Sequence, residues 1–300
     1  MHFADALTQH IRDTSPLSVG IDPVMEHLPE GIPKTIAGAS AFCRGIIDAV
    51  ANIAACVKLQ LACYELLRGE GMRLFWDIAA YAKERGLIVI ADGKRNDIGS
   101  TAELYAEAYL GKESPIDALT VNPYLGGDSI QPFIERCARN EKGIFVLIKT
   151  SNPGSRDLQD LSVATISESS LRRSKLHEYI GQLVQNWGLP HLGQQSHLSC
   201  IGAVVGATYP EELKYLRSLM PNIPFLIPGI GAQGGTVDDM RHGFLTNGAG
   251  AIVHTTRSVT YASHGKDWRE EARIRAEEIA RHFTSHCVPA ASGAGVSNQL

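Results

Sequence analysis

Eight short apolar runs dominate the sequence and limit what it can fold into. Each is rich in Val, Ile, Leu and Ala, has about the length of one strand, and is almost continuously apolar. Strands that are buried on both faces of a parallel sheet have this character. The runs span residues 17–21, 54–59, 87–91, 116–121, 144–148, 201–205, 224–227 and 251–254.

Helical patterns lie between these runs, at residues 39–50, 66–85, 100–110, 130–139, 175–187, 211–219, 237–246 and 268–283. Eight strands that alternate with helices favour an α/β fold of the (β/α)8 type, a TIM barrel, over a six-stranded doubly wound sheet. We expect residues 1–285 to form one such domain and the small, polar residues 286–300 to form a mobile tail. The long polar segment 155–199 has the length of a lid or a surface insertion.

Composition narrows the range of partners. The chain has 28 basic and 32 acidic residues, a formal net charge of −4, which argues against general nucleic-acid binding. It contains no 18-residue apolar run and no basic-then-apolar start of a signal peptide. Its six Cys are scattered without a C-x-x-C pattern, as free thiols in a reducing compartment are. We therefore expect a cytoplasmic protein that does not bind membranes or nucleic acid.

Charged residues follow the first three apolar runs. Asp22 comes after the first, Lys58 lies in the second, and Asp92 and Lys94 follow the third. Asp92 and Lys94 are two residues apart, so on a strand they point to the same side. Since barrel active sites lie at the carboxyl ends of the strands, these groups are expected to form one paired network there. Separate ion pairs at the rim remain the alternative.

The same segment, DGKRNDIGST, continues to Asp97 and Thr101. If a helix starts near Asp97, these two residues share one of its faces. For Asp97 alone, a role as a helix N-cap explains the residue equally well.

A glycine-rich turn follows the seventh run. Gly229-x-Gly231-x-x-Gly234 matches the dinucleotide fingerprint, but that site needs an acidic residue about 20 positions later. Thr256 and Arg257 stand there instead. Barrel enzymes bind phosphate between the loops after strands seven and eight, which favours a phosphate site made by residues 231–235 and 256–257. An ordinary turn and a surface ion pair are the structural alternatives.

The spacing Asp92-x-Lys94-x-x-Asp97-Ile98-x-x-Thr101, preceded by Lys58, resembles the signature of the orotidine 5′-phosphate decarboxylase family. The resemblance covers residues 17–261. The segments KTSNPGS, GAVVGATYPEEL and PGIGAQGG are similar to the longer bacterial subgroup. The resemblance implies decarboxylation of orotidine 5′-monophosphate to uridine 5′-monophosphate in pyrimidine biosynthesis, with no cofactor and no metal, by a homodimer with shared active sites.

The resemblance also implies roles for individual residues. Lys94 would stabilise and then protonate the carbanion, and Asp92 would face the substrate carboxylate. Lys58 and Asp22 would hold the ribose, while Asp97 and Thr101 would cross the dimer interface into the partner's site.

The remaining roles concern the two ends of the substrate. Ser151, which follows the fifth run with Lys149 and Thr150, matches the residue that contacts the pyrimidine. Gln233 would bridge phosphate and base, and Arg257 would bind the phosphate, together with Gly234 and Thr256.

Three other functions stay open at this point. A related phosphosugar decarboxylase, such as 3-keto-gulonate-phosphate decarboxylase, carries a similar acid-x-Lys-x-x-Asp motif but uses Mg²⁺. A non-catalytic barrel that binds phosphosugars is the second alternative. An NAD-binding domain is the third, and the missing acidic residue weakens it. The 11 His show no H-E-x-x-H pattern.

Overall fold

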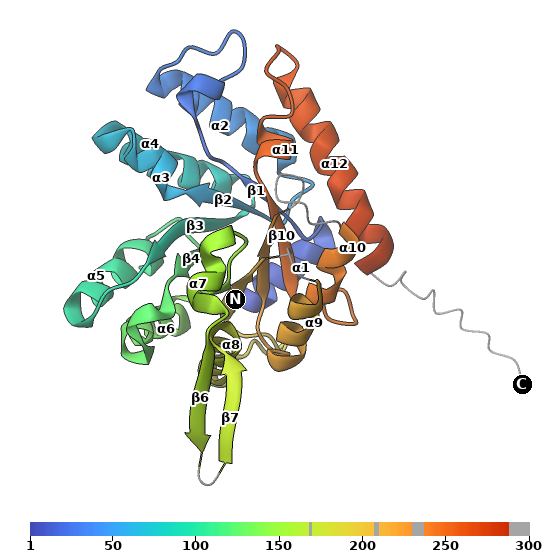
Figure 1. Ribbon diagram of the computed structural model, residues 1–300. Coiled ribbons are helices and arrows are strands. Elements are labelled where there is room, and N and C mark those ends of the chain that lie inside the picture. The colour runs from blue at the N-terminus through green and yellow to red at the C-terminus, as the bar shows by residue number, and fades with distance from the viewer. Residues whose placement is uncertain (168–169, 207–209, 230–236, 288–300) are drawn as a thin grey trace, which may run out of the picture.

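The eight predicted strands form one closed parallel barrel (Figure 1). The computed structural model describes residues 1–167, 170–206, 210–229 and 237–287. The barrel strands pair in the order β1-β10-β9-β8-β5-β4-β3-β2. Their bounds are β1 Leu17–Gly20, β2 Cys56–Gln60, β3 Ile88–Arg95, β4 Ala118–Val121, β5 Gly143–Lys149, β8 Ile201–Val205, β9 Phe225–Pro228 and β10 Ala251–Thr255. The predicted (β/α)8 architecture is therefore confirmed.

Helices surround the barrel, as Figure 1 shows. Seven of the eight predicted helices are present: α2 Ile36–Val50, α4 Arg68–Glu84, α5 Gly99–Leu110, α6 Gly127–Asn140, α8 Leu176–Gly188, α9 Pro210–Leu219 and α12 Trp268–Cys287. Shorter helices are α3 Leu61–Glu65, α7 Arg156–Gln159 and α11 Arg257–Thr260. Single turns are η1 Met25–His27, η2 Pro123–Leu125, η3 Pro153–Ser155 and η4 Leu189–His191. Within the described ranges, no helix combines the length and apolar character that crossing a bilayer requires.

The prediction of a helix over residues 237–246 is wrong for the second half of that range. Only α10 Val237–Met240 and the turn η5 Arg241–Gly243 form there. The buried Arg217 donates from Nε to the carbonyl oxygen of Gly243 at 2.8 Å, and Phe244 then turns into the core. Tertiary contacts therefore end the helix before its apolar pattern does.

A helix before the first strand, α1 Phe3–Asp13, was not predicted. Its buried face carries Phe3, Leu7 and Ile11. Phe3 packs edge-on against Phe145 of β5 with ring centroids 6.1 Å apart. A side chain on Gly143 would clash with the Phe3 ring, since a Cβ built there lies 2.4 Å from it. This helix therefore packs at the amino end of β5, opposite the end at which a barrel builds its active site.

The segment 155–199 contains an antiparallel hairpin of β6 Ser162–Ser167 and β7 Ser170–Lys175. In Figure 1 the hairpin projects away from the barrel, and its base lies next to α7 and α8. Its strands pair only with each other, so it is a surface insertion that leaves the barrel order unchanged. The boundary predicted between a domain and a tail at residue 286 stays a prediction, because residues 288–300 lie outside the described ranges.

Candidate active site

A cavity of about 260 Å³ opens at the carboxyl ends of the barrel strands. Its polar wall comes from β2, β3, β4 and β10, and its apolar wall from β5, β8 and β9. The turn after β5 completes the rim. The lining residues are Lys58, Asp92, Lys94, Thr120, Leu147, Thr150, Ser151, Asn152, Val204, Leu226, Pro228 and His254.

Three of the predicted residues form a chain of alternating charge in the polar wall. Asp92 accepts from Lys58 Nζ through Oδ2 and from Lys94 Nζ through Oδ1, each at 2.6 Å. Lys58 and Asp92 are buried, with 5% and 9% exposed, whereas the side chain of Lys94 is 45% exposed. The predicted network thus forms for Lys58, Asp92 and Lys94 but does not include Asp22, and its outer ammonium, that of Lys94, faces the cavity.

The electrostatics of this chain keep both buried groups ionised. Burial by itself would raise the pKa of Asp92, but the ammonium groups of Lys58 and Lys94 outweigh it and hold that pKa well below its usual range. Burial would likewise lower the pKa of Lys58, yet the carboxylates of Asp92 and Asp22 raise it. At neutral pH the buried Lys58–Asp92 pair is therefore ionised, and the half-exposed Lys94 side chain is paired with its carboxylate.

The backbone around Lys94 is irregular. Lys94 has a φ of 47°, in the left-handed region, and the β3–β4 register shifts between Ala91 and Arg95. Thr120 of β4 fixes this bulge, since its Oγ1 donates to Asp92 Oδ1 at 2.8 Å and accepts from the Lys94 backbone N–H at 2.9 Å. Sequence reasoning missed Thr120. The available signal was a hydroxyl in the otherwise apolar end of the fourth run.

Asp22 and Thr256 meet at the junction of β1 and β10. Asp22 accepts from the Gln60 backbone N–H at 2.9 Å and from Thr256 Oγ1 at 3.0 Å. Burial raises the pKa of Asp22, although Lys58 and these hydrogen bonds oppose the shift. Gly20 is required beside them, because a Cβ there would lie 2.0 Å from Thr256 Oγ1.

His254, which sequence reasoning also missed, extends this set of contacts. Its Nδ1 lies 3.1 Å from Ser18 Oγ, and its Nε2 lies 3.3 Å from Thr256 Oγ1. Burial and the nearby Lys58 ammonium lower the pKa of His254 well below its usual value. Because Thr256 donates its hydroxyl proton to Asp22, its oxygen is free to accept from the Nε2–H tautomer of the neutral ring.

Of the residues predicted to bind the base and the phosphate, the structure describes only some. Ser151 lines the cavity between Thr150 and Asn152. Arg257 is exposed at the start of α11, directly after β10. Gln233 and Gly234 lie outside the described residues.

Asp97 and Thr101 do not reach this cavity. Asp97 accepts from the backbone N–H of Ile98 at 2.9 Å, and Thr101 is exposed on α5. The N-cap position of α5 is Ile98, so the alternative that made Asp97 the cap is wrong. Neighbouring apolar side chains are also exposed: Ile98 60%, Leu104 71%, Tyr124 76% and Leu125 44%.

A closed parallel barrel with a lysine–aspartate–lysine array in the cavity at the carboxyl ends of its strands defines a (β/α)8-barrel enzyme. Comparison with known families gives a narrower result: the profile of the orotidine 5′-phosphate decarboxylase / HUMPS family matches residues 15–273. The chain belongs to this family.

Individual relatives agree. An orotidine 5′-phosphate decarboxylase of Rhodopirellula baltica is 44% identical in an alignment of 294 positions that covers 93% of each chain. The enzyme of that name from Caldicellulosiruptor bescii is 40% identical and covers 87% of this chain and 90% of its own. The structure of Leishmania donovani OMP decarboxylase superposes with a TM-score of 0.72 at 31% identity, over 94% of this chain and 99% of that one. A solved structure from Streptomyces avermitilis superposes with a TM-score of 0.80 at 33% identity, over 95% of both chains.

Proposed function

We propose that this chain decarboxylates orotidine 5′-monophosphate to uridine 5′-monophosphate in pyrimidine biosynthesis, without a cofactor. The observation that carries the proposal is the Lys58–Asp92–Lys94 array, whose outer ammonium faces a cavity large enough for a pyrimidine ring. The family assignment and the names of the relatives support the same reaction.

Lys94 is the group suited to the chemical step. When the bond between C6 and the carboxylate breaks, its electron pair stays on C6, which has no adjacent carbonyl to accept it. A fixed ammonium stabilises that charge and then transfers one of its protons to C6. The resulting neutral amine regains a proton from water, so atoms and charge balance over one turnover.

The rest of the array holds Lys94 and the sugar. Asp92 pairs with both lysines and faces the substrate carboxylate. The two carboxylates repel each other, and this repulsion ends as CO₂ leaves. Lys58 and Asp22 bind the ribose hydroxyls. Opposite them, Leu147, Val204 and Leu226 form an apolar wall that favours a departing neutral molecule.

The remaining substrate contacts lie at the rim. Ser151 reads the pyrimidine edge from the turn after β5. We assign the phosphate to Gln233, Gly234, Thr256 and Arg257. Arg257 supports this assignment because an exposed guanidinium directly after the last barrel strand can bind two phosphate oxygens.

We also propose a homodimer in which Asp97 and Thr101 complete the partner's site. The exposed apolar side chains Ile98, Leu104 and Tyr124 around them support this, since such patches mark interfaces. Mixing Lys94→Ala chains with Asp97→Ala chains tests it. Random pairing restores one intact site in each mixed dimer, or about a quarter of wild-type activity. No recovery after subunit exchange would refute shared sites.

Cytoplasmic location is part of the proposal. The five described cysteines, Cys43, Cys56, Cys63, Cys137 and Cys200, are free, and all but Cys63 are buried. Free thiols are characteristic of a reducing compartment.

The decisive experiment follows the absorbance of orotidine 5′-monophosphate with wild type and Lys94→Ala. We expect the variant to lose at least about a thousand-fold in kcat, given the usual size of proton-transfer and electrostatic contributions. Unchanged turnover would refute the mechanism. Activity that disappears with EDTA would favour the Mg²⁺-dependent relatives, and tight binding of uridine 5′-monophosphate without CO₂ release would favour a non-catalytic barrel.

A further inference from the structure

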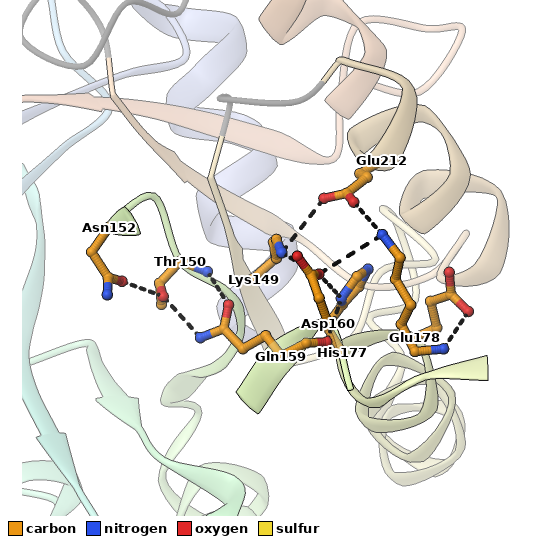
Figure 2. Close-up of polar contacts among 9 residues, drawn as sticks. Lys149, Thr150, Asn152, Gln159, Asp160, His177, Glu178 and Glu212 are labelled. Carbon is orange, nitrogen blue, oxygen red and sulfur yellow. Dashed lines mark hydrogen bonds and ion pairs between the residues drawn. The ribbon is translucent and has the colours of Figure 1, made fainter. Parts of the chain in front are cut away.

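A partly buried ionic cluster lies outside the cavity, behind the turn that follows β5 (Figure 2). Lys149, the last residue of β5, is only 2% exposed. Its Nζ lies 2.5 Å from Asp160 Oδ1 and 3.7 Å from Glu212 Oε2. A lysine at the end of a barrel strand is therefore held by carboxylates outside the cavity and is not among the residues that line it.

Two further residues complete the cluster. Lys175 Nζ, at the end of β7, lies 2.7 Å from Glu212 Oε1 and 3.8 Å from Asp160 Oδ1. His177 Nδ1, on α8, lies 3.4 Å from Asp160 Oδ1 and 2.8 Å from the carbonyl oxygen of Gln159. Figure 2 shows the side chains of Lys149, Asp160, His177 and Glu212 converging from β5, the segment after α7, α8 and α9.

The cluster has the ligand types of a metal site but not the charge of one. Ligand atoms of Asp160, His177 and Glu212 lie within 4.8 Å of one another. However, the ammonium groups of Lys149 and Lys175 already contact both carboxylates, so two positive charges balance two negative ones. A divalent cation would add charge that nothing in the cluster compensates. The arrangement is that of a structural ion-pair network.

This network is coupled to the cavity through Gln159. The Gln159 side-chain oxygen accepts from the Thr150 backbone N–H at 2.9 Å, and its Nε2 donates to Thr150 Oγ1 at 2.8 Å. Thr150 in turn donates to Asn152 Oδ1 at 2.7 Å. Lys149, the last residue of β5, is thus bound by Asp160, and Thr150, which follows it, is bound by Gln159, the last residue of α7.

We propose that Gln159 is a positioning residue for pyrimidine recognition: it fixes the turn 150–152, and the Lys149–Asp160 pair anchors Gln159 in that position. The inference rests on the proposed function, in which this turn reads the base. The inserted segment that carries the hairpin then holds the turn 150–152, which forms part of one cavity wall, in a fixed position. Gln159 is not among the residues that line the cavity, so it acts on binding of the base and not on proton transfer.

The test separates base recognition from the rest of the substrate. Gln159→Ala should raise KM for orotidine 5′-monophosphate and Kd for uridine 5′-monophosphate about tenfold, as expected for two lost hydrogen bonds. kcat should stay within about threefold. Affinity for ribose 5-phosphate, which lacks the base, should stay within about twofold. Gln159→Glu, which keeps an acceptor for the Thr150 N–H, should recover most of the loss. Gln182→Ala on α8 is the matched control, since Gln182 is exposed.

Two results would overturn the proposal. Equal weakening of both ligands would mean that the substitution loosens the whole site, and unchanged KM and Kd would mean that the turn does not need Gln159. If Gln159→Ala does not fold, the two affinities are compared in Gln159→Glu instead. We then expect a smaller loss of affinity for uridine 5′-monophosphate and none for ribose 5-phosphate. Failure of the proposed function is distinguishable, because the wild type itself would then not turn over orotidine 5′-monophosphate.

Discussion

Removing the hydroxyl of Thr120 tests how far the geometry of Lys94 depends on one neutral side chain. Thr120→Val keeps the shape of the residue but deletes the hydrogen bond to Asp92 and leaves the Lys94 backbone N–H without its acceptor. A hydrogen bond to a charged group contributes about 1.5–3 kcal/mol and a neutral one about 0.5–1.5 kcal/mol. The two together amount to roughly 2–4.5 kcal/mol, since Thr120 is 1% exposed and its hydrogen bonds are largely shielded from solvent.

Part of this loss should appear in stability and part in catalysis. We expect the free energy of unfolding, measured with denaturant, to fall by about 2 kcal/mol. We expect kcat to fall between about tenfold and a hundredfold, because each 1.4 kcal/mol of lost transition-state stabilisation is a factor of ten. Thr120→Ser is the matched control and should stay within about threefold of wild type, since it keeps the hydroxyl.

A Val variant with wild-type kcat and an unfolding free energy within about 0.5 kcal/mol of wild type would refute this reasoning. It would show that the bulge holds Lys94 in place without the Thr120 hydroxyl. A loss of stability at unchanged kcat would separate the two roles and leave only the structural one.

Three further perturbations follow from other parts of the molecule. The raised pKa of Asp22 means that this group stabilises the fold most below its unfolded pKa, near 3.8, and loses that contribution as the pH rises through the folded value. The unfolding free energy of wild type relative to Asp22→Asn, measured with denaturant at a series of pH values, should therefore fall as the pH rises from 3 through the folded pKa. Gly20→Ala, whose added Cβ would lie 2.0 Å from Thr256 Oγ1, should raise KM at least about tenfold with a smaller effect on kcat; an unchanged KM would mean that Thr256 moves freely. Arg217→Met removes donors to four backbone carbonyls and should lower the unfolding free energy by about 3–5 kcal/mol without changing kcat of the folded enzyme, which denaturant titration and steady-state kinetics check together.

The sequence predicts the barrel well because its strands are buried on both faces, and continuous apolar runs identify such strands without any tertiary information. The charges of Lys58, Asp92 and Lys94 are equally informative, since each interrupts or ends an apolar run. Helix α1 is a different case. Its apolar residues, Phe3 and Leu7 among them, recur at helical spacing, so the signal was present although the prediction omitted it.

Other features depend on contacts between distant residues. The pairing of Lys149 and Thr150 with Asp160 and Gln159 exists only because the inserted segment folds back on β5. The hairpin strands, SVATIS and SLRRSK, have too little apolar alternation to predict a buried face, since they pair only with each other. In the sequence Thr120 is a polar residue in a buried strand, and its role is visible only once the fold places Asp92 beside it.

The left-handed backbone of Lys94 has a consequence for engineering this enzyme. A lysine in that conformation costs about 1 kcal/mol relative to glycine, which adopts it without steric conflict. Asp92 would still be paired with Lys58 if Lys94 were replaced by glycine, and this remaining pair limits the cost of losing the half-exposed Lys94 ammonium. A search for thermostable variants that measured melting temperature alone would therefore accept Lys94→Gly as neutral or favourable. The selected variant would melt at a higher temperature but lack the proposed proton donor, so any such search on this chain has to measure turnover as well as melting temperature.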